Sequence, residues 1–199
     1  MELQEVRERD QKTAHWKKEI ITWIRTIAVI LILVGLVRGF LFTNYIVHGQ
    51  SMMPTIHDGE RIIVNKIGYE IGVPERFDLI IFHATEESDY IKRIIGVPGD
   101  HVMYKGDTLF VNGEPYEEDF LKHNRENYEH GLFTEDFSLE SITGYEQVPE
   151  GYVFVLGDNR RNSLDSRHIG FVKVEDIVGK ANLAYWPPKN FRFYSTTKH

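Results

Sequence analysis

The stretch Tyr90–Asp100, YIKRIIGVPGD, decides the fold class that this chain can adopt. It joins a run rich in Ile to a turn with Pro98 and Gly99 at the central positions, which is the pattern of a strand followed by a tight turn. Runs of the same kind, separated by Gly, Pro, Asp and Asn, lie on both sides of it: RIIVNKI, DLIIFHA, DTLFVNGEPY, GYVFVLGD and DIVGKANLAYW. We therefore expect a mainly β protein in which residues 43–199 form an antiparallel sheet or barrel-like domain.

The composition excludes several classes of protein. Of the 199 residues, 42% are hydrophobic and 27% are charged, which argues against disorder and against a membrane protein with many spans. The formal net charge of -7 offers no general attraction for nucleic acid. Because cysteine is absent, disulfides, thiolate zinc sites and cysteine nucleophiles are excluded. No HExxH-type motif or Gly-rich phosphate loop occurs, so we expect neither a metal nor a cofactor.

One apolar segment, Ile20–Phe42, is long enough to be a membrane anchor. Its 23 residues would span roughly 34 Å as a helix, with Arg25 and Arg38 reaching toward opposite head-group layers. Basic residues lie mainly before it: Arg7, Arg9, Lys12, Lys17 and Lys18. This asymmetry predicts a cytoplasmic tail at residues 1–19, a transmembrane helix at 20–42 and an extracytoplasmic remainder, in a single-pass protein of the cell membrane.

Two other interpretations of the apolar segment remain, a buried core helix and a cleaved secretory signal. A cleaved signal needs small residues at alternating positions just beyond the apolar run. The sequence after it, RGFLFTNY, has no such pair. We therefore prefer an uncleaved anchor that places the following residues beside the lipid bilayer.

Residues 114–150 differ from the rest of the predicted β domain. They hold eleven Asp and Glu residues against Lys122 and Arg125 and contain few strand-like runs. His123 and His130 could join the carboxylates in a metal site, but their spacing matches no known ligand motif. We therefore expect a polar insertion that forms a solvated acidic loop.

Two separate residues suggest nucleophilic catalysis. Ser51 follows the predicted anchor in VHGQSMMPTI, where a serine near proline is often only a turn residue. Lys92 and Arg93 interrupt an apolar strand, on which neighbours point to opposite faces, so one should face inward and the other outward. A buried lysine can serve as a base, because lowering its pKa from about 10.4 to near 7 corresponds to roughly 4 to 5 kcal/mol. The other interpretation is a lysine that protects an edge strand from aggregation.

A third cluster of polar residues, GDNRRNSLDSR, occupies positions 157–167. It brings hydroxyl, carboxylate and guanidinium groups into one loop after a strand. Such a loop is either a solvated turn or a support that holds a hydroxyl against a buried amine while an Asp–Arg pair fixes the backbone.

Taken together and in this order, the three clusters and the strand RFDLIIF closely resemble the type I signal peptidases, endopeptidases that remove signal peptides from exported proteins with a serine–lysine pair. The resemblance runs from the anchor to about Trp186. It implies that Ser51 is the nucleophile and Lys92 the general base, and that Ser163 orients the lysine amine by a hydrogen bond. The supporting residues it implies are Asp158, Asp165, Arg167 and Arg93. The walls it implies for small apolar substrate pockets are Val47, Met52, Ile56, Tyr90 and Ile91.

The resemblance also indicates one branch of the family and shows one difference from the pattern of some members. A lysine rather than a histidine at the base position is similar to the bacterial enzymes. Some members carry a hydroxyl residue two positions before the nucleophile that helps to bind the oxyanion, whereas here this position is Gly49. The oxyanion hole would then depend on backbone N–H groups, including that of Ser51. Gly49, one anchor and a short chain look like enzymes of Gram-positive bacteria.

Two other functions compete with this one. A self-cleaving repressor-type serine–lysine peptidase would need a DNA-binding headpiece where this chain has an apolar anchor. A membrane-tethered β-domain that only binds partners would not explain why the serine, the lysine and the Gly-Asp-Asn sequence occur together. The expected partners are the signal peptides of exported preproteins, met at the translocation machinery, and the lipid bilayer, but not nucleic acid.

Overall fold

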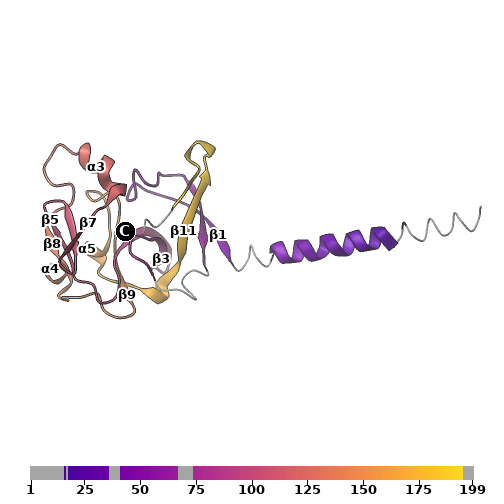
Figure 1. Ribbon diagram of the computed structural model, residues 1–199, viewed down its shortest axis with the longest axis horizontal. Coiled ribbons are helices and arrows are strands. Elements are labelled where there is room, and N and C mark those ends of the chain that lie inside the picture. Colours follow the sequence, from indigo (N-terminus) through magenta and orange to yellow (C-terminus); the bar gives the residue numbers. More distant parts are fainter. Residues whose placement is uncertain (1–15, 17, 36–40, 67–73, 195–199) are drawn as a thin grey trace, which may run out of the picture. The chain divides into compact units, whose positions relative to one another are not determined.

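The computed structural model describes residues 16, 18–35, 41–66 and 74–194. The chain divides into two units, residues 1–41 and 42–199, and in the first unit residues 18–35 form a helix (Figure 1). Within the described ranges, no helix has both the length and the apolar composition that a bilayer crossing requires. The predicted tail and the end of the predicted span fall partly on residues 1–15, 17 and 36–40, which lie outside the described residues.

The second unit is built around a large antiparallel sheet, which confirms the expected mainly β class. The strand order is β1-β2-β11-β3-β4-β9-β10, and β12 pairs with β11 at its side. The strands are β1 (Phe42–Ile46), β2 (Arg61–Asn65), β3 (Leu79–Thr85), β4 (Ser88–Gly96), β9 (Tyr152–Leu156), β10 (Val172–Lys173), β11 (Ile177–Trp186) and β12 (Arg192–Phe193).

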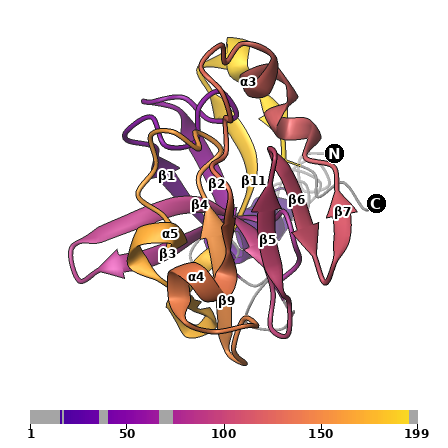
Figure 2. The ribbon, with the colours of Figure 1, turned by 90° about the vertical axis from the view of Figure 1, so that its left-hand side faces the viewer.

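A smaller antiparallel sheet, in the order β7-β6-β5-β8, lies in the same unit. Figure 2 shows β5, β6 and β7 side by side, with α3 near them. The strands of this smaller sheet are β5 (Val102–Lys105), β6 (Thr108–Val111), β7 (Glu114–Tyr116) and β8 (Phe137–Ser138). Short helical turns connect the strands: η1 (Asp119–Leu121), α3 (Lys122–Glu126), α4 (Leu139–Thr143), α5 (Ser166–Ile169), η2 (Val174–Asp176) and η3 (Pro188–Asn190).

Strand β4 is the central element for the site, because apolar clusters cover both of its faces. Ile94 packs in one cluster and Ile95 in another, and both side chains are fully buried. The expectation that only one of Lys92 and Arg93 faces inward is therefore wrong. Both are buried, since the strand lies inside the unit and not at an edge.

The expectation of a solvated acidic loop at residues 114–150 is also wrong for much of that segment. It contains β7, η1, α3, β8 and α4, and the side chains of Leu121 and Leu139 are buried in it. Glu118 is buried as well and accepts a hydrogen bond from the Tyr104 hydroxyl at 2.7 Å. Acidic composition misled the prediction, because buried arginines neutralise a part of it.

Candidate active site

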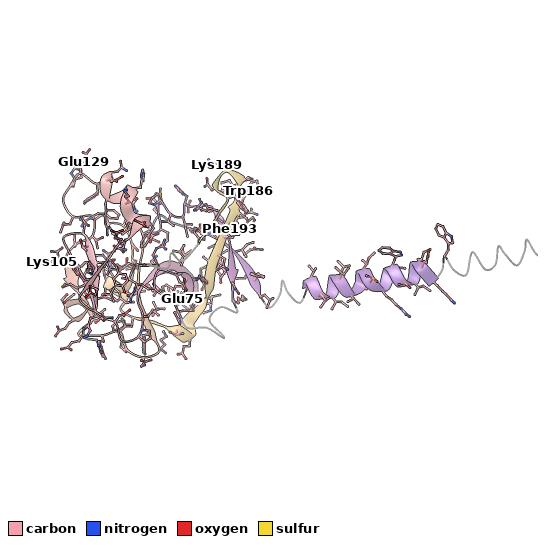
Figure 3. All side chains as sticks on the ribbon, in the orientation of Figure 1. Glu75, Lys105, Glu129, Trp186, Lys189 and Phe193 are labelled. Atoms are coloured by element: carbon pink, nitrogen blue, oxygen red, sulfur yellow. The ribbon has the colours of Figure 1, made fainter. Side chains whose placement is uncertain are left out.

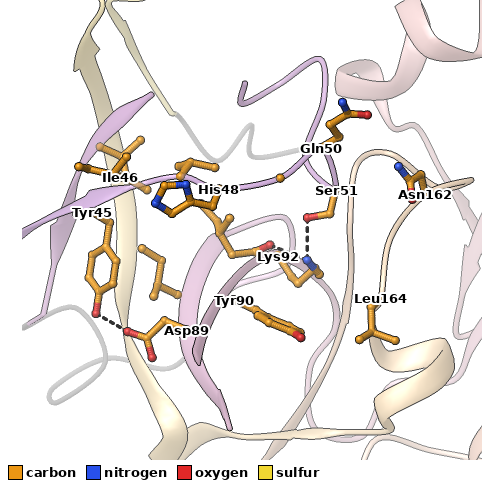
Figure 4. A pocket seen from close by; sticks show the side chains of 15 residues that line it. Tyr45, Ile46, His48, Gln50, Ser51, Asp89, Tyr90, Lys92, Asn162 and Leu164 are labelled. Carbon is orange, nitrogen blue, oxygen red and sulfur yellow. Dashed lines mark hydrogen bonds between the residues drawn. The ribbon is translucent and has the colours of Figure 1, made fainter. Parts of the chain in front are cut away.

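Ser51 and Lys92 meet at one cavity of about 320 Å³. Ser51 lies in the loop between β1 and β2, and Lys92 extends from β4. Lys92 Nζ lies 2.8 Å from Ser51 Oγ and donates to the carbonyl oxygen of Ile91 at 3.1 Å. Figure 4 shows the two side chains facing each other at the cavity wall. A hydroxyl and an amine at this distance can exchange a proton directly.

The environment of Lys92 favours the neutral amine. Its side chain is almost completely buried, with 4% exposed, and desolvation lowers its pKa from 10.5 to about 8. The negative charges of Asp165 and Asp158 act in the opposite direction and raise the pKa. Burial is the larger effect, so about a tenth of the lysine is neutral at pH 7.

The loop that carries Ser51 has a backbone form that requires glycine before it. Gly49 has a φ of 91°, a conformation that strains any other side chain, and its amide donates to the Asp58 carboxylate at 2.8 Å. Two backbone hydrogen bonds close the base of the loop, from Val47 to Glu60 and from Gly59 to Val47, both at 2.8 Å. A hydroxyl residue at position 49 would therefore be strained in this loop, although a Cβ atom there would meet no other atom within 4 Å.

The loop after β9 holds the nucleophile from the other side. The backbone N–H of Asn159 donates to the Ser51 carbonyl oxygen at 2.9 Å, and its side-chain nitrogen donates to the Gln50 carbonyl oxygen at 3.1 Å. Gly157 allows this close approach: a Cβ there would lie 2.1 Å from Ser163 Oγ and 2.6 Å from the Ser51 carbonyl oxygen. Asn159 belongs to the Gly-Asp-Asn stretch, and the sequence pattern indicated no role for it.

Arg93 and Asp158 fix that loop to β4. The Arg93 guanidinium donates to both carboxylate oxygens of Asp158, at 2.9 and 2.7 Å, and to the Phe77 carbonyl oxygen at 2.9 Å. It also lies over the ring of Phe120, 3.8 Å from the ring centre. The pair thus ties Asp158, in the loop after β9, to strand β4.

Asp165 and Arg167 form a second pair at the start of α5. Asp165 caps the helix and accepts from the Gly157 amide at 3.0 Å, while Arg167 donates to both of its oxygens at 2.9 Å. Burial raises the pKa of the Asp165 carboxyl, but the hydrogen bonds and charge of Arg167 and the Gly157 amide outweigh it and hold the pKa below its usual value. Asp165 is therefore an anion beside the active site.

The hydrogen bond expected between Ser163 and Lys92 is not formed. The Ser163 Oγ atom is buried and has no hydrogen-bond partner. The hydroxyl does contribute to lowering the pKa of Asp165, so it lies near that carboxylate without the geometry of a hydrogen bond. Ser163 Oγ thus lies close to the Asp165 carboxylate and makes no hydrogen bond to Lys92.

The cavity extends from the serine and lysine along β1 and β4. Of the five residues expected to form substrate pockets, Val47, Tyr90 and Ile91 line this cavity. Met52 and Ile56 are not in its lining and are buried in an apolar cluster of the same unit. The prediction also missed further lining residues from β1, β2, β3, β4 and the loop after β9: Tyr45, Ile46, Ile62, Ile81, Asp89 and Leu164.

The far end of the cavity is polar. The Tyr45 hydroxyl donates to Asp89 at 2.7 Å, a contact that Figure 4 shows away from the serine. Nothing in the sequence pattern placed these two residues together, because 44 positions separate them in the chain.

One more residue touches the nucleophile loop, and no sequence signal indicated it. Asn124 in α3 donates from its side-chain nitrogen to the carbonyl oxygens of Met53 and Asp158, both at 3.2 Å. It comes from the acidic segment, which composition alone assigned to solvent.

Comparison with known proteins identifies the family. A family model described as signal peptidase, peptidase S26, matches residues 20–186. Signal peptidase I of Bacillus caldolyticus is 51% identical over 165 residues, which cover 83% of this chain and 91% of that protein. Signal peptidase IB of Staphylococcus aureus (strain MRSA252) is 41% identical over 181 residues, covering 89% of this chain and 95% of that protein.

A crystal structure of a signal peptidase I from Enterococcus faecalis V583 is similar as well. The two structures match with a TM-score of 0.51 and 44% sequence identity. The match covers 54% of this chain and 95% of the Enterococcus faecalis chain. The matches make the protein a peptidase that processes signal peptides. The chain belongs to the signal peptidase family, peptidase S26.

Proposed function

We propose that the protein cuts preproteins by a serine–lysine mechanism in which Ser51 attacks the scissile carbonyl carbon. Neutral Lys92 takes the Ser51 hydroxyl proton as the Oγ–carbon bond forms. The lysine then gives this proton to the leaving amine as the carbon–nitrogen bond breaks. An acyl-enzyme remains, and Lys92 next takes a proton from the water whose oxygen attacks the acyl carbon. The lysine returns this proton to Ser51 Oγ as the Oγ–carbon bond breaks, which releases the new C-terminal carboxyl group and restores the serine. The observation that carries the proposal is the 2.8 Å contact between a nearly buried amine and a serine hydroxyl.

The negative charge that develops on the carbonyl oxygen needs hydrogen-bond donors. We assign one to the backbone N–H of Ser51. Gly49 provides no side-chain donor, and its own amide is occupied by Asp58. The Asn159 side chain donates to the carbonyl oxygen of Gln50, which belongs to the same peptide group as the Ser51 N–H, so this peptide group keeps its orientation during the reaction.

Ser163 has a proposed role in orienting Lys92 during turnover. Its hydroxyl is buried and unengaged, and such groups in native structures call for an explanation such as catalysis. When Lys92 becomes protonated, its ammonium has three donors, and the Ser163 hydroxyl is a free acceptor in the same site.

The cavity fits small apolar side chains before the cut. Val47 and Ile91 contribute apolar walls beside the nucleophile, and Ile62 and Ile81 contribute to the floor. A narrow apolar pocket favours Ala-like residues at the first and third positions before the cut and excludes large or charged ones. This is the specificity that we assign to the protein.

The proposed location is the cell membrane, with the segment 20–42 as a single anchor, the N-terminus in the cytoplasm and the catalytic unit outside. The Lys/Arg asymmetry before the segment supports this orientation. Exposed aromatic side chains support a position at a lipid surface: Trp186 is 51%, Phe191 56% and Phe193 71% exposed. Figure 3 shows Trp186, Lys189 and Phe193 around the same end of β11. Substrates would arrive there from the translocation machinery.

The test is cleavage of one exported precursor by the purified full chain in detergent, with the cut mapped by mass spectrometry. The wild type should cut after a small residue, and Ser51→Ala should not cut. A protein that binds the precursor but never cuts it would support the binding-only function instead. Protease added to intact protoplasts should digest residues beyond 42, and their protection would overturn the proposed orientation.

A further inference from the structure

We propose that Asn124 is a positioning residue for the nucleophile, through which the segment 114–150 acts on catalysis. The proposal rests on the function proposed above for Ser51. Asn124 lies in α3, far in sequence from both loops of the active site, and yet its side chain touches each of them.

The contact has a defined chemistry. Both partners of Asn124 are carbonyl oxygens, those of Met53 and Asp158, so its amide nitrogen and not its amide oxygen must face them. The nitrogen carries two hydrogens, one for each carbonyl. Met53 is two residues after the nucleophile, and Asp158 is the residue before Asn159. A single side chain therefore ties the nucleophile loop to the loop that supports it.

Asn159 makes the reciprocal connection. Its backbone and side-chain N–H groups donate to the carbonyl oxygens of Ser51 and Gln50. The two asparagines thus join residues 50–53 to residues 158–159 at four carbonyl groups. Each loop limits the movement of the other, and Ser51 Oγ is held where Lys92 can reach it.

The element that carries Asn124 is itself fixed. Its neighbour Arg125 pairs with Glu118 at 2.6 Å, and the same carboxylate pairs with Arg160 at 2.6 Å. Glu118 and Arg160 are both fully buried, and Arg160 follows Asn159 directly in the chain. Because α3 is anchored by these ion pairs, Asn124 acts from a rigid support. Errors of about 1 Å in such positioning cost on the order of 100-fold in rate.

Asn124 does not line the substrate cavity, and it makes no hydrogen bond to Lys92, so its loss should change kcat and not KM. The Asn124→Ala variant should fold, because Asn124 is only partly buried and alanine has a higher helix propensity than asparagine. A fall in rate would then not come from an unfolded helix.

The experiment measures kcat, KM and the melting temperature of the full-length protein with a precursor peptide. Asn124→Ala should lower kcat about 10-fold or more with KM within about 2-fold of wild type. Asn124→Asp should lower kcat further, because a carboxylate has no N–H to donate and faces two carbonyl oxygens. Asn124→Gln, which keeps the donor on a longer side chain, should restore part of the rate.

Asn127→Ala is the matched control, since Asn127 lies in the same short segment and its side chain donates to the His123 carbonyl oxygen, away from the site. Its kcat should be that of wild type. An unchanged kcat in Asn124→Ala, or an equal loss in Asn127→Ala, would overturn the proposal, and so would a rise in KM at constant kcat. If Asn124→Ala melts below the assay temperature, the kcat values of Asn124→Gln and Asn124→Asp test the proposal instead. Equal kcat values for these two variants would overturn it. Cutting by Ser51→Ala would instead defeat the proposed function, whatever the Asn124 variants do.

Discussion

Lys92 and Arg93 are consecutive residues of β4, and both side chains are buried, with 4% and 6% exposed. They point to opposite faces of the strand and have separate tasks. Lys92 reaches the nucleophile, and Arg93 pairs with Asp158 in the loop that holds the backbone of the nucleophile. One strand therefore contacts Ser51 directly through Lys92 and the loop that supports Ser51 through Arg93.

The pH dependence of cleavage should report the amine of Lys92. Only the neutral amine accepts the Ser51 proton, and burial lowers its pKa to about 8. We expect kcat/KM to rise tenfold per pH unit below pH 8 and to level off above it, in a precursor assay run from pH 6 to 10.

Lys92→Arg is the control for this prediction. Arginine keeps the positive charge and much of the length but does not deprotonate at these pH values. We expect it to be as inactive as Lys92→Ala. Substantial cutting by folded Lys92→Arg at neutral pH would show that the residue acts as a charge and not as a base.

Burial of Lys92 should also cost stability. The pKa of Lys92 is lowered from 10.5 in the unfolded chain to about 8 in the folded one. Below pH 8 this difference lowers the free energy of unfolding by about 3 kcal/mol. Lys92→Met removes this cost and loses one hydrogen bond to Ser51. We expect it to be about 1 to 3 kcal/mol more stable than wild type at pH 7 in denaturant unfolding.

The difference should shrink as the pH rises from 8 to 10.5, because the folded lysine is then neutral and the free energy needed to remove the proton from the unfolded lysine falls with pH. A gain in stability that is the same at pH 7 and pH 10.5 would mean that desolvation of the charge is not its cause.

The strands and the reacting pair could be predicted from the sequence for a clear reason. Strand signals such as the apolar run around Ile94 and the turn at Pro98 are local, and the Ser51 and Lys92 clusters each stand out against their surroundings. Their association came from the resemblance to a family. Local patterns do not report that β4 is covered on both faces, so Arg93 was expected to face solvent if Lys92 did not.

Contacts between distant segments could not be predicted in the same way. The bond from Asn124 to Met53 joins residues 71 positions apart, and it originates in a segment whose composition is typical of a solvated loop. Glu118 shows why composition failed: its charge is matched by Arg125 and Arg160, which only the fold brings to it. Met52 lies in an apolar cluster and not in the cavity lining, and the sequence around Ser51 does not distinguish these two positions for an apolar residue.

The buried Arg93–Asp158 pair should be costly to break from one side. Asp158→Ala leaves the guanidinium buried without its carboxylate, and about 3 to 5 kcal/mol of stability should be lost. The exposed pair of Arg161 and Glu135 is the matched control, and Glu135→Ala should cost less than about 1 kcal/mol. Equal losses for the two variants in thermal unfolding would contradict the structural role of Arg93.

The cavity should select small residues in the substrate. A precursor with Ala at the first and third positions before the cut should be processed, while Phe or Lys at the first position should block cutting, because apolar side chains line the cavity and its carboxylate, Asp89, lies away from Ser51. The products are identified by mass spectrometry. Efficient cutting after Lys would show that these residues do not form the pocket for the first position.

Ser163 allows the sharpest separation of catalysis from folding. Its Oγ atom is buried and unbonded, so Ser163→Ala loses no hydrogen bond and should keep its stability to within about 1 kcal/mol. If the hydroxyl orients Lys92 during turnover, kcat should nevertheless fall by about 10- to 1000-fold. Ser166, a buried serine at the start of α5, is the contrast, because its Oγ accepts from the Val155 backbone N–H at 2.9 Å. Ser166→Ala leaves that N–H unsatisfied and should lose about 1 to 3 kcal/mol of stability with a smaller effect on kcat. An unchanged kcat in Ser163→Ala would reduce Ser163 to a residue that fills the space beside Gly157.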